Sequence, residues 1–200
     1  MNYDLIMEEQ IKNIDKTQPT LLLHSCCAPC SSACLERLGN FFAITIFYYN
    51  PNITDLEEYN KRLAEVERFA SQFKTKYEIK VVSGSYEPNK FFEMAKGLET
   101  EPERGKRCYK CYEMRLLETA KYATTHNFDY FATTLTLSPY KNSNWINQIG
   151  ENLNNNFNST YLYSDFKKKN GYKRSIELSK EYNLYRQNYC GCIYSKREGN

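Results

Sequence analysis

The chain has 200 residues, of which 41% are hydrophobic and 26% are charged, with only 8 Gly and 6 Pro. This composition excludes collagen-like, low-complexity and mostly disordered proteins, and the length predicts a single α/β domain over residues 1–200. The formal net charge of +3 is too small to indicate a nucleic-acid partner by itself. Eight cysteines against two histidines are the feature that needs an explanation.

Cysteine chemistry depends on the compartment in which the protein works. The apolar runs are shorter than a membrane span, and the charged N-terminus lacks the apolar core of a signal peptide. We therefore expect a cytoplasmic protein that does not associate with membranes. Because structural disulfides are rare in the reducing cytosol, metal binding or redox chemistry is the preferred interpretation of the cysteines.

Strands and helices are predicted to alternate along the chain. The expected helices cover residues 3–16, 28–38, 55–73, 88–94, 108–123, 145–153 and 175–181, and the expected strands cover 20–24, 41–49, 77–82, 128–137 and 161–163. The first strand is apolar without alternation, as is typical of a strand buried on both faces. The pattern predicts a mostly parallel five-stranded sheet with helices on both faces, a Rossmann-like α/β fold.

In such folds ligands bind beyond the carboxyl ends of the strands. Four segments would form that edge, at residues 25–30, 50–52, 83–86 and 134–141. The first of these contains three cysteines. The fold and the cysteine chemistry thus indicate the same crevice.

The first cysteine motif, CCAPC, places Cys26 and Cys27 at a strand-to-helix turn and Cys30 in the first helical turn. Free backbone N–H groups and the positive end of the helix stabilise thiolates there. The second motif, Cys108-Tyr-Lys-Cys111, opens another helix with the spacing that lets two sulfurs face one metal.

The third motif is Cys190-Gly-Cys192, whose disulfide would be strained and easily reduced, as suits a redox pair. Cys34 has no motif partner and is interpreted as a small core residue. His24 is interpreted as a neutral, hydrogen-bonded histidine and His126 as an exposed one. On spacing alone, an iron–sulfur cluster, a structural zinc and a set of reactive thiols all remain open.

The C-terminal segment 167–200 is basic and rich in tyrosine. It contains nine Lys or Arg against three Glu, so the rest of the chain is mildly acidic. An ordinary solvated face is one interpretation. The other is an edge that contacts phosphates, because tyrosines lie between the basic residues.

With these motifs in hand, the chain resembles the epoxyqueuosine reductase family of the QueH type. The resemblance covers nearly the whole length, through strings such as LLLHSCCAPC, FYYNPNI, GKRCYKCYEMRL and RQNYCGCIYS. It implies a fold of the nucleotide-binding HUP class. It also implies an oxidoreductase that reduces the epoxide of epoxyqueuosine to give queuosine, at the wobble position of a tRNA anticodon.

The resemblance also implies a role for each motif. Cys26, Cys27, Cys108 and Cys111 would hold a [4Fe–4S] cluster. Cys30 is surplus to that scheme, and would either bind a second iron ion beside the cluster or replace one of the four ligands. The third motif, Cys190 and Cys192, would be a redox-active disulfide pair that acts in catalysis.

Removal of the epoxide oxygen as water takes two electrons and two protons. The partners implied are therefore tRNA carrying epoxyqueuosine and an unidentified electron donor of low potential. Asp165, after the fifth strand, is the candidate carboxylate that protonates the departing oxygen or binds a metal, although a helix cap or a surface ion pair would equally explain it. Two other functions stay open: a zinc-stabilised RNA-binding module, and a cytosolic iron–sulfur protein that exchanges thiols and disulfides.

Overall fold

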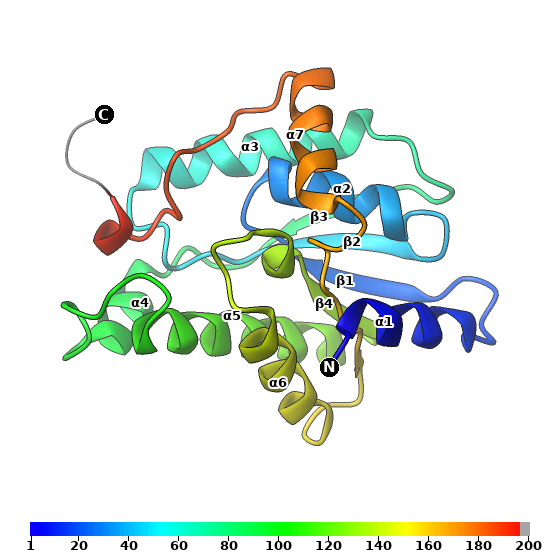
Figure 1. Ribbon diagram of the computed structural model, residues 1–200, viewed down its shortest axis with the longest axis horizontal. Helices are drawn as coiled ribbons and strands as arrows, with labels where there is room; N and C mark the ends of the chain where they lie inside the picture. Colours follow the sequence, from blue (N-terminus) through cyan, green and yellow to red (C-terminus); the bar gives the residue numbers. More distant parts are fainter. Residues whose placement is uncertain (197–200) are drawn as a thin grey trace.

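Five parallel strands form the centre of the molecule, in the order β3-β2-β1-β4-β5 (Figure 1). They are β1 (Thr20–His24), β2 (Ala43–Tyr48), β3 (Lys80–Ser83), β4 (Tyr130–Thr133) and β5 (Thr160–Tyr161). This computed structural model describes residues 1–196. Arg197 and Glu198, which the sequence analysis counts in the basic segment, lie outside the described residues.

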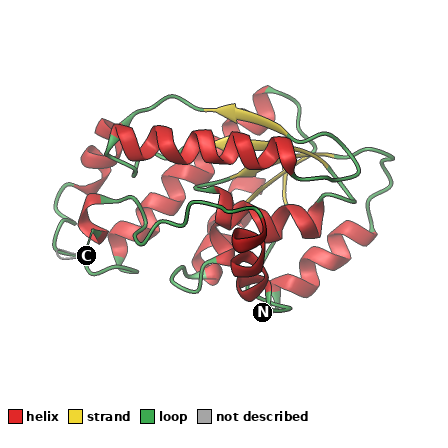
Figure 2. Ribbon diagram, turned by 90° about the horizontal axis from the view of Figure 1, so that it is seen from above, coloured by secondary structure: helices red, strands yellow, loops and turns green. Residues whose placement is uncertain are grey.

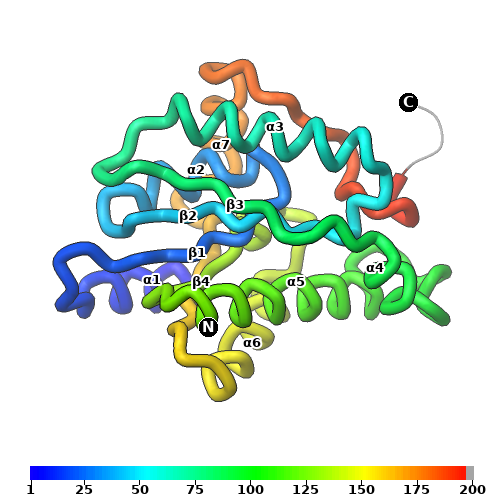
Figure 3. The backbone as a smooth tube through the Cα atoms, turned by 180° about the vertical axis from the view of Figure 1, so that it is seen from behind, coloured from blue at the N-terminus to red at the C-terminus, as the bar shows by residue number. Residues whose placement is uncertain are grey.

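Helices cover both faces of the sheet. They are α1 (Tyr3–Lys12), α2 (Ala28–Leu38), α3 (Leu56–Gln72), α4 (Pro88–Ala95), α5 (Lys106–Thr125), α6 (Ser143–Asn154) and α7 (Gly171–Glu181). Helices α2, α3 and α7 lie on one face, and α5 and α6 lie on the other (Figures 1 and 3). Viewed from above, the helices of the first face cover the strands (Figure 2).

Alternating side chains of the strands build two separate cores. Leu21 and Leu23 of β1 pack into the core beneath α2, α3 and α7, whereas Leu22 between them packs into the core with α5 and α6. All three are fully buried. Successive strand residues point to opposite faces, so an uninterrupted apolar run is what a doubly covered strand requires. The predicted fold class is confirmed.

One predicted element differs in extent. The sequence predicts a strand over 128–137, but β4 ends at Thr133 and residues Thr134–Leu137 form a 3-10 turn. The Thr133 hydroxyl accepts a hydrogen bond from the backbone N–H of Leu135 at 3.1 Å, which turns the chain out of the sheet. This turn brings the following loop, which ends at Lys141, to the carboxyl edge of the sheet.

The chain after α7 returns to the same edge. Figures 1 and 3 both show it running along α3 toward the first turn of that helix. Glu65 of α3 accepts a hydrogen bond from the backbone N–H of Tyr185, and Glu58 accepts one from the Tyr185 hydroxyl. Within residues 1–196, no helix is long and apolar enough to cross a membrane.

Candidate metal centre

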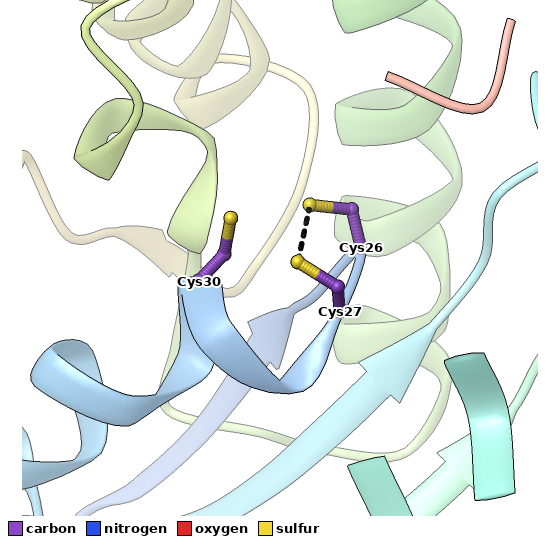
Figure 4. A group of neighbouring side chains, drawn as sticks. All are labelled: Cys26, Cys27 and Cys30. Carbon is purple, nitrogen blue, oxygen red and sulfur yellow. Dashed lines mark hydrogen bonds between the residues drawn. The ribbon is translucent and has the colours of Figure 1, made fainter. Parts of the chain in front are cut away.

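The sulfurs of Cys26, Cys27 and Cys30 lie together where β1 leads into α2 (Figure 4). All three Sγ atoms are within 4.8 Å of one another, and those of Cys26 and Cys27 are 3.7 Å apart. Cys27 is the N-cap residue in extended conformation, and Pro29 occupies the first turn. Two thiolates on one tetrahedral ion at about 2.3 Å are about 3.8 Å apart, so this group can bind a metal.

Buried polar groups fix the backbone beneath these sulfurs. The Ser25 and Ser31 hydroxyls are 2.6 Å apart, and the Ser31 hydroxyl donates to the carbonyl of Cys27 at 3.0 Å. The side-chain amide of Asn50, after β2, donates to the carbonyl of Ser25 at 2.9 Å. Two neighbouring strand ends are therefore tied together directly below the cysteine group.

The three thiols do not ionise alike. Hydrogen bonds from Cys27 and Cys30 hold the pKa of Cys26 well below its usual range. The hydrogen bond to Cys26, with burial, raises the pKa of Cys27 to about 12. Hydrogen bonds to Cys26 and Cys27, with burial, raise the pKa of Cys30 well above its usual range. One thiolate is thus stabilised by two thiols. A metal ion is the partner that would allow all three sulfurs to be anionic together.

The second pair, Cys108 and Cys111, lies on the first turns of α5, which begins at Lys106. Their spacing puts both sulfurs on one side of the helix. Both line a small cavity of about 30 Å³. Burial raises the pKa of Cys111 to about 12, and the backbone N–H of Arg104 donates to the Cys108 sulfur at 3.3 Å.

The third motif contributes to the lining of the same cavity. Cys190 and Cys192 both line the 30 Å³ cavity, and Cys190 also lines a larger cavity of about 240 Å³ that reaches Cys26 and Cys30. All eight cysteines are free thiols in the structure. The three motifs, separated in the sequence, therefore meet at two cavities that share Cys190.

Long-range contacts hold the third motif in place. Arg62 of α3 donates to the carbonyl of Cys190 at 3.2 Å, and the side-chain amide of Asn52 approaches the same carbonyl at 3.5 Å. Gly191 has a φ of +99°, and a Cβ there would meet Ile53. This left-handed turn requires glycine, which explains the residue between the two cysteines.

Three residues outside the motifs have clear surroundings. Cys34 is fully buried in the core beneath α2, as predicted. His24 is also fully buried, between the Thr133 hydroxyl and the Tyr49 carbonyl, and burial lowers its pKa to about 3, so it is neutral. His126 is exposed and stacks on Tyr122. These environments agree with the sequence interpretation.

Asp165 is placed differently from the cysteines. It lies after β5, at the carboxyl end of the sheet, but its carboxylate pairs with Lys167 at 2.8 Å. It is not among the described residues that line the two cysteine cavities. The structure does not bring this carboxylate to the sulfurs.

Sequence reasoning missed the cations of the site. Arg115 and Arg107 are buried on α5, and Lys141 lines both cavities. Arg107 donates from one nitrogen to the carbonyls of Leu98, Glu99 and Glu101, which fixes the loop before α5. Arg115 lies four residues after Cys111, on the same face of the helix. That spacing is a signal that the sequence already contained.

The comparisons with known proteins agree on one family. A family model described as epoxyqueuosine reductase QueH matches residues 21–198. The chain is 44% identical to epoxyqueuosine reductase QueH of Streptococcus pyogenes, over 98% of this chain and 79% of that protein. The QueH of Staphylococcus epidermidis is 46% identical over 98% of the chain and 84% of its own length. The QueH of Thermotoga maritima is 36% identical over 90% and 91% respectively.

Proposed function

The chain belongs to the epoxyqueuosine reductase QueH family, and from this premise we propose that it reduces epoxyqueuosine to queuosine at the wobble position of a tRNA anticodon. It is an oxidoreductase. The observation that supports this chemistry best is the convergence of three cysteine motifs on two adjoining cavities. We further propose that the enzyme works in the reducing cytoplasm, where its thiols stay free.

Thiolates of the first two motifs would hold a [4Fe–4S] cluster, with Cys26, Cys27, Cys108 and Cys111 as its ligands. Iron–sulfur clusters are bound by Cys thiolates. Cys26, Cys27 and Cys111 are buried and Cys108 is half-buried. Arg115 favours the charged form of Cys26 and Cys111. Cys30 is then a fifth sulfur beyond the four cluster ligands, and it would bind a second iron ion next to the cluster. When bound, the cluster supplies electrons one at a time.

The reaction balances with the third motif as the two-electron store. Both carbon–oxygen bonds of the epoxide break, a carbon–carbon double bond forms and the oxygen leaves as water. The thiols of Cys190 and Cys192 supply two electrons and two protons as they close to a disulfide. An external donor of low potential then reduces that disulfide. Cys190 lines both cavities, so it is accessible to substrate on one side and close to the metal ligands on the other.

The larger cavity is the proposed entrance for the modified base. Tyrosines and cations surround it, namely Tyr140, Tyr172, Tyr189, Lys141 and Arg186. Aromatic faces stack on unpaired bases, and cations hold phosphates, which are the two main ways in which proteins hold single-stranded RNA. A base splayed out of the anticodon loop could thus reach the sulfurs, while the basic segment contacts the phosphates of the stem.

Asp165 is retained as the proposed group that passes one of the two thiol protons to the departing oxygen, on its position at the carboxyl end of the sheet. Its pairing with Lys167 makes the test specific. If Asp165 donates the proton, Asp165→Asn lowers kcat at unchanged cluster content. If the pair only supports the local fold, the same variant leaves kcat unchanged and lowers stability alone.

The test is an anaerobic assay on tRNA that carries epoxyqueuosine, with a strong reductant and mass identification of the nucleoside product. Queuosine formation by protein that contains iron and acid-labile sulfide would support the proposal. Zinc alone, in a colourless protein, would favour the zinc-stabilised RNA-binding module. Reduction of a small disulfide without any queuosine would favour the thiol–disulfide oxidoreductase. In a Cys30→Ser variant, loss of iron without loss of sulfide would support the second iron ion.

A further inference from the structure

Arg115 is a fully buried cation without a carboxylate partner. Its side chain has no exposed surface, and no ion pair to it occurs among residues 1–196. One terminal nitrogen, Nη2, donates to the side-chain oxygen of Asn50 at 2.6 Å, and Nε lies 3.3 Å from Nε2 of His24. The other terminal nitrogen, Nη1, is buried with no hydrogen-bond partner.

The groups that hold Arg115 do not neutralise it. Asn50 is uncharged, and the buried His24 is neutral because burial lowers its pKa to about 3. An isolated charge in the protein interior is strongly unfavourable unless an opposite charge compensates it. The compensating anion of Arg115 must therefore come from another direction.

The groups of the metal site that lie beside Arg115 are sulfurs. Cys111 is one turn and Cys108 about two turns earlier on the same face of α5. Lys141 lines both cavities together with Cys190, and the larger cavity also with Cys26 and Cys30. No ion pair to Lys141 occurs in the described part of the chain either.

Two other guanidinium groups that lie wholly or largely inside the molecule are paired with carboxylates. Arg37 on α2 lies 2.7 Å from Asp4, and Arg62 on α3 lies 2.7 Å from Glu58. Arg107, the second buried arginine of α5, also has no carboxylate partner, but it donates to three backbone carbonyls of the preceding loop. Arg115 has one neutral amide, one neutral imidazole and a buried nitrogen with no partner among the described residues.

We propose that Arg115, assisted by Lys141, is a positioning residue that supplies the countercharge of the thiolate-bound cluster and raises its reduction potential. This inference rests on the proposed function. A cluster bound by four thiolates is anionic, and reduction adds a further negative charge, so a fixed cation beside it favours the reduced form. The free Nη1–H would donate to a sulfur of the cluster site, and such hydrogen bonds favour reduction in the same sense.

The experiment measures the midpoint potential of the cluster by redox titration followed by EPR. In Arg115→Met the ratio of reduced to oxidised cluster at a fixed potential should fall at least tenfold, which is about 59 mV for a one-electron couple. Arg115→Lys keeps the charge and should recover most of the shift. Lys141→Met should lower the potential in the same direction.

Arg37→Met is the control, because it removes a largely buried guanidinium that is paired with Asp4 and lies about 15 Å along α2 from Cys27. Its potential should equal that of the unmodified protein. Equal potentials in Arg115→Met and Arg115→Lys would overturn the proposal. If neither Arg115 variant retains the cluster, an unchanged potential in Lys141→Met would overturn it. Unmodified protein without iron and sulfide would instead overturn the proposed function, and this inference with it.

Discussion

Charged side chains at the two ends of the parallel sheet have different partners. At the amino end, Asp129 accepts from Lys16 at 2.7 Å and from the backbone and hydroxyl of Thr20 at 2.8 and 2.7 Å. At the carboxyl end, buried nitrogens of Arg107 and Arg115 have no hydrogen-bond partner among the described residues. The carboxylate of Asp129 is thus satisfied by the protein alone. The N–H donors of the two arginines need an acceptor, such as a sulfur of a bound cluster, the substrate or water.

This difference indicates that residues at the amino end of the strands stabilise the fold, whereas residues at the carboxyl end serve the metal site and the reaction. Substitutions at the amino end should change the free energy of unfolding and leave the chemistry intact. Substitutions at the carboxyl end should change metal content and activity with less effect on the metal-free fold. The following predictions test that separation, from the largest expected effect to the smallest.

The largest effect is expected from removal of a metal-binding sulfur. Cys111→Ala should lose most of its iron and lower kcat at least ~100-fold, since even partners of metal ligands contribute 10–100-fold. Cys34→Ala is the control, because its thiol lies in the apolar core and should affect only stability, by about 1 kcal/mol. Iron and sulfide analysis with the queuosine assay checks both. Similar iron contents in the two variants would refute the assignment of Cys111.

The next prediction compares the paired, largely buried Arg37 with the fully buried Arg115 in metal-free protein. Arg37→Met leaves the carboxylate of Asp4 buried and unpaired, so it should lower the free energy of unfolding by about 3 kcal/mol. Arg115→Met removes a cation without a partner and should cost less than about 1 kcal/mol, or stabilise the metal-free protein. Urea unfolding after chelation measures both. Equal losses would show that Arg115 is compensated by the protein itself.

A smaller effect is expected at the amino end, from Asp129→Asn. Partial burial raises the pKa of Asp129, but bonds from Lys16 and Thr20 outweigh it and lower the pKa. A carboxyl whose pKa is lower in the folded state contributes its stability above the unfolded pKa of about 3.9 and loses it as pH falls through the folded value. The variant should therefore be about 1–2 kcal/mol less stable at pH 6.

The same variant provides a pH test. The stability difference between Asp129→Asn and the unmodified protein should decrease below about pH 4 and vanish once both states are protonated. Denaturant unfolding at a series of pH values measures this. Iron content at pH 7 should equal that of the unmodified protein, and a loss of iron would contradict the separation of the two ends.

The smallest effect concerns tRNA affinity. Lys168 is exposed and has no ion pair within residues 1–196, whereas Lys169 pairs with Glu8. Lys168→Gln should weaken tRNA binding a few-fold and reduce the slope of log K against log salt by about 1. Lys169→Gln should change the slope less. Measurement of tRNA binding at several salt concentrations tests this prediction. Equal slopes in the unmodified protein and the two variants would exclude the basic segment from the interface.

Much of the fold was predictable because local signals agreed with tertiary requirements. The apolar run before Cys26 requires burial on both faces, and α2 occupies the predicted range 28–38 because Pro29 favours its first turn. The carboxyl-edge location of the first motif followed from the parallel sheet alone. The predicted end of β4 was wrong. Thr133 is compatible with a strand, but its hydroxyl caps the 3-10 turn that follows.

The remainder depends on contacts that the sequence pattern does not contain. The position of Cys190 is set by Arg62, which is 128 residues away in the sequence. The spacing of Arg115 after Cys111 puts it on the cysteine face of α5, but its burial does not follow from the pattern, because most arginines are exposed. Asp165 was a reasonable candidate by its position after a strand, yet a neighbouring lysine engages its carboxylate. Sequence patterns predict which segments meet, and packing decides which atoms face one another.

The distance along the chain between the first two cysteine motifs has a consequence for folding. About 80 residues separate Cys27 from Cys108. A metal bound by both would act as a cross-link that closes this loop, and in the chain-entropy model of such links a closure of that length stabilises the folded state by about 4–5 kcal/mol. Insertion of the cluster would then also increase the free energy of unfolding. Oxygen, by destroying the cluster, would remove both the electron-transfer group and this cross-link.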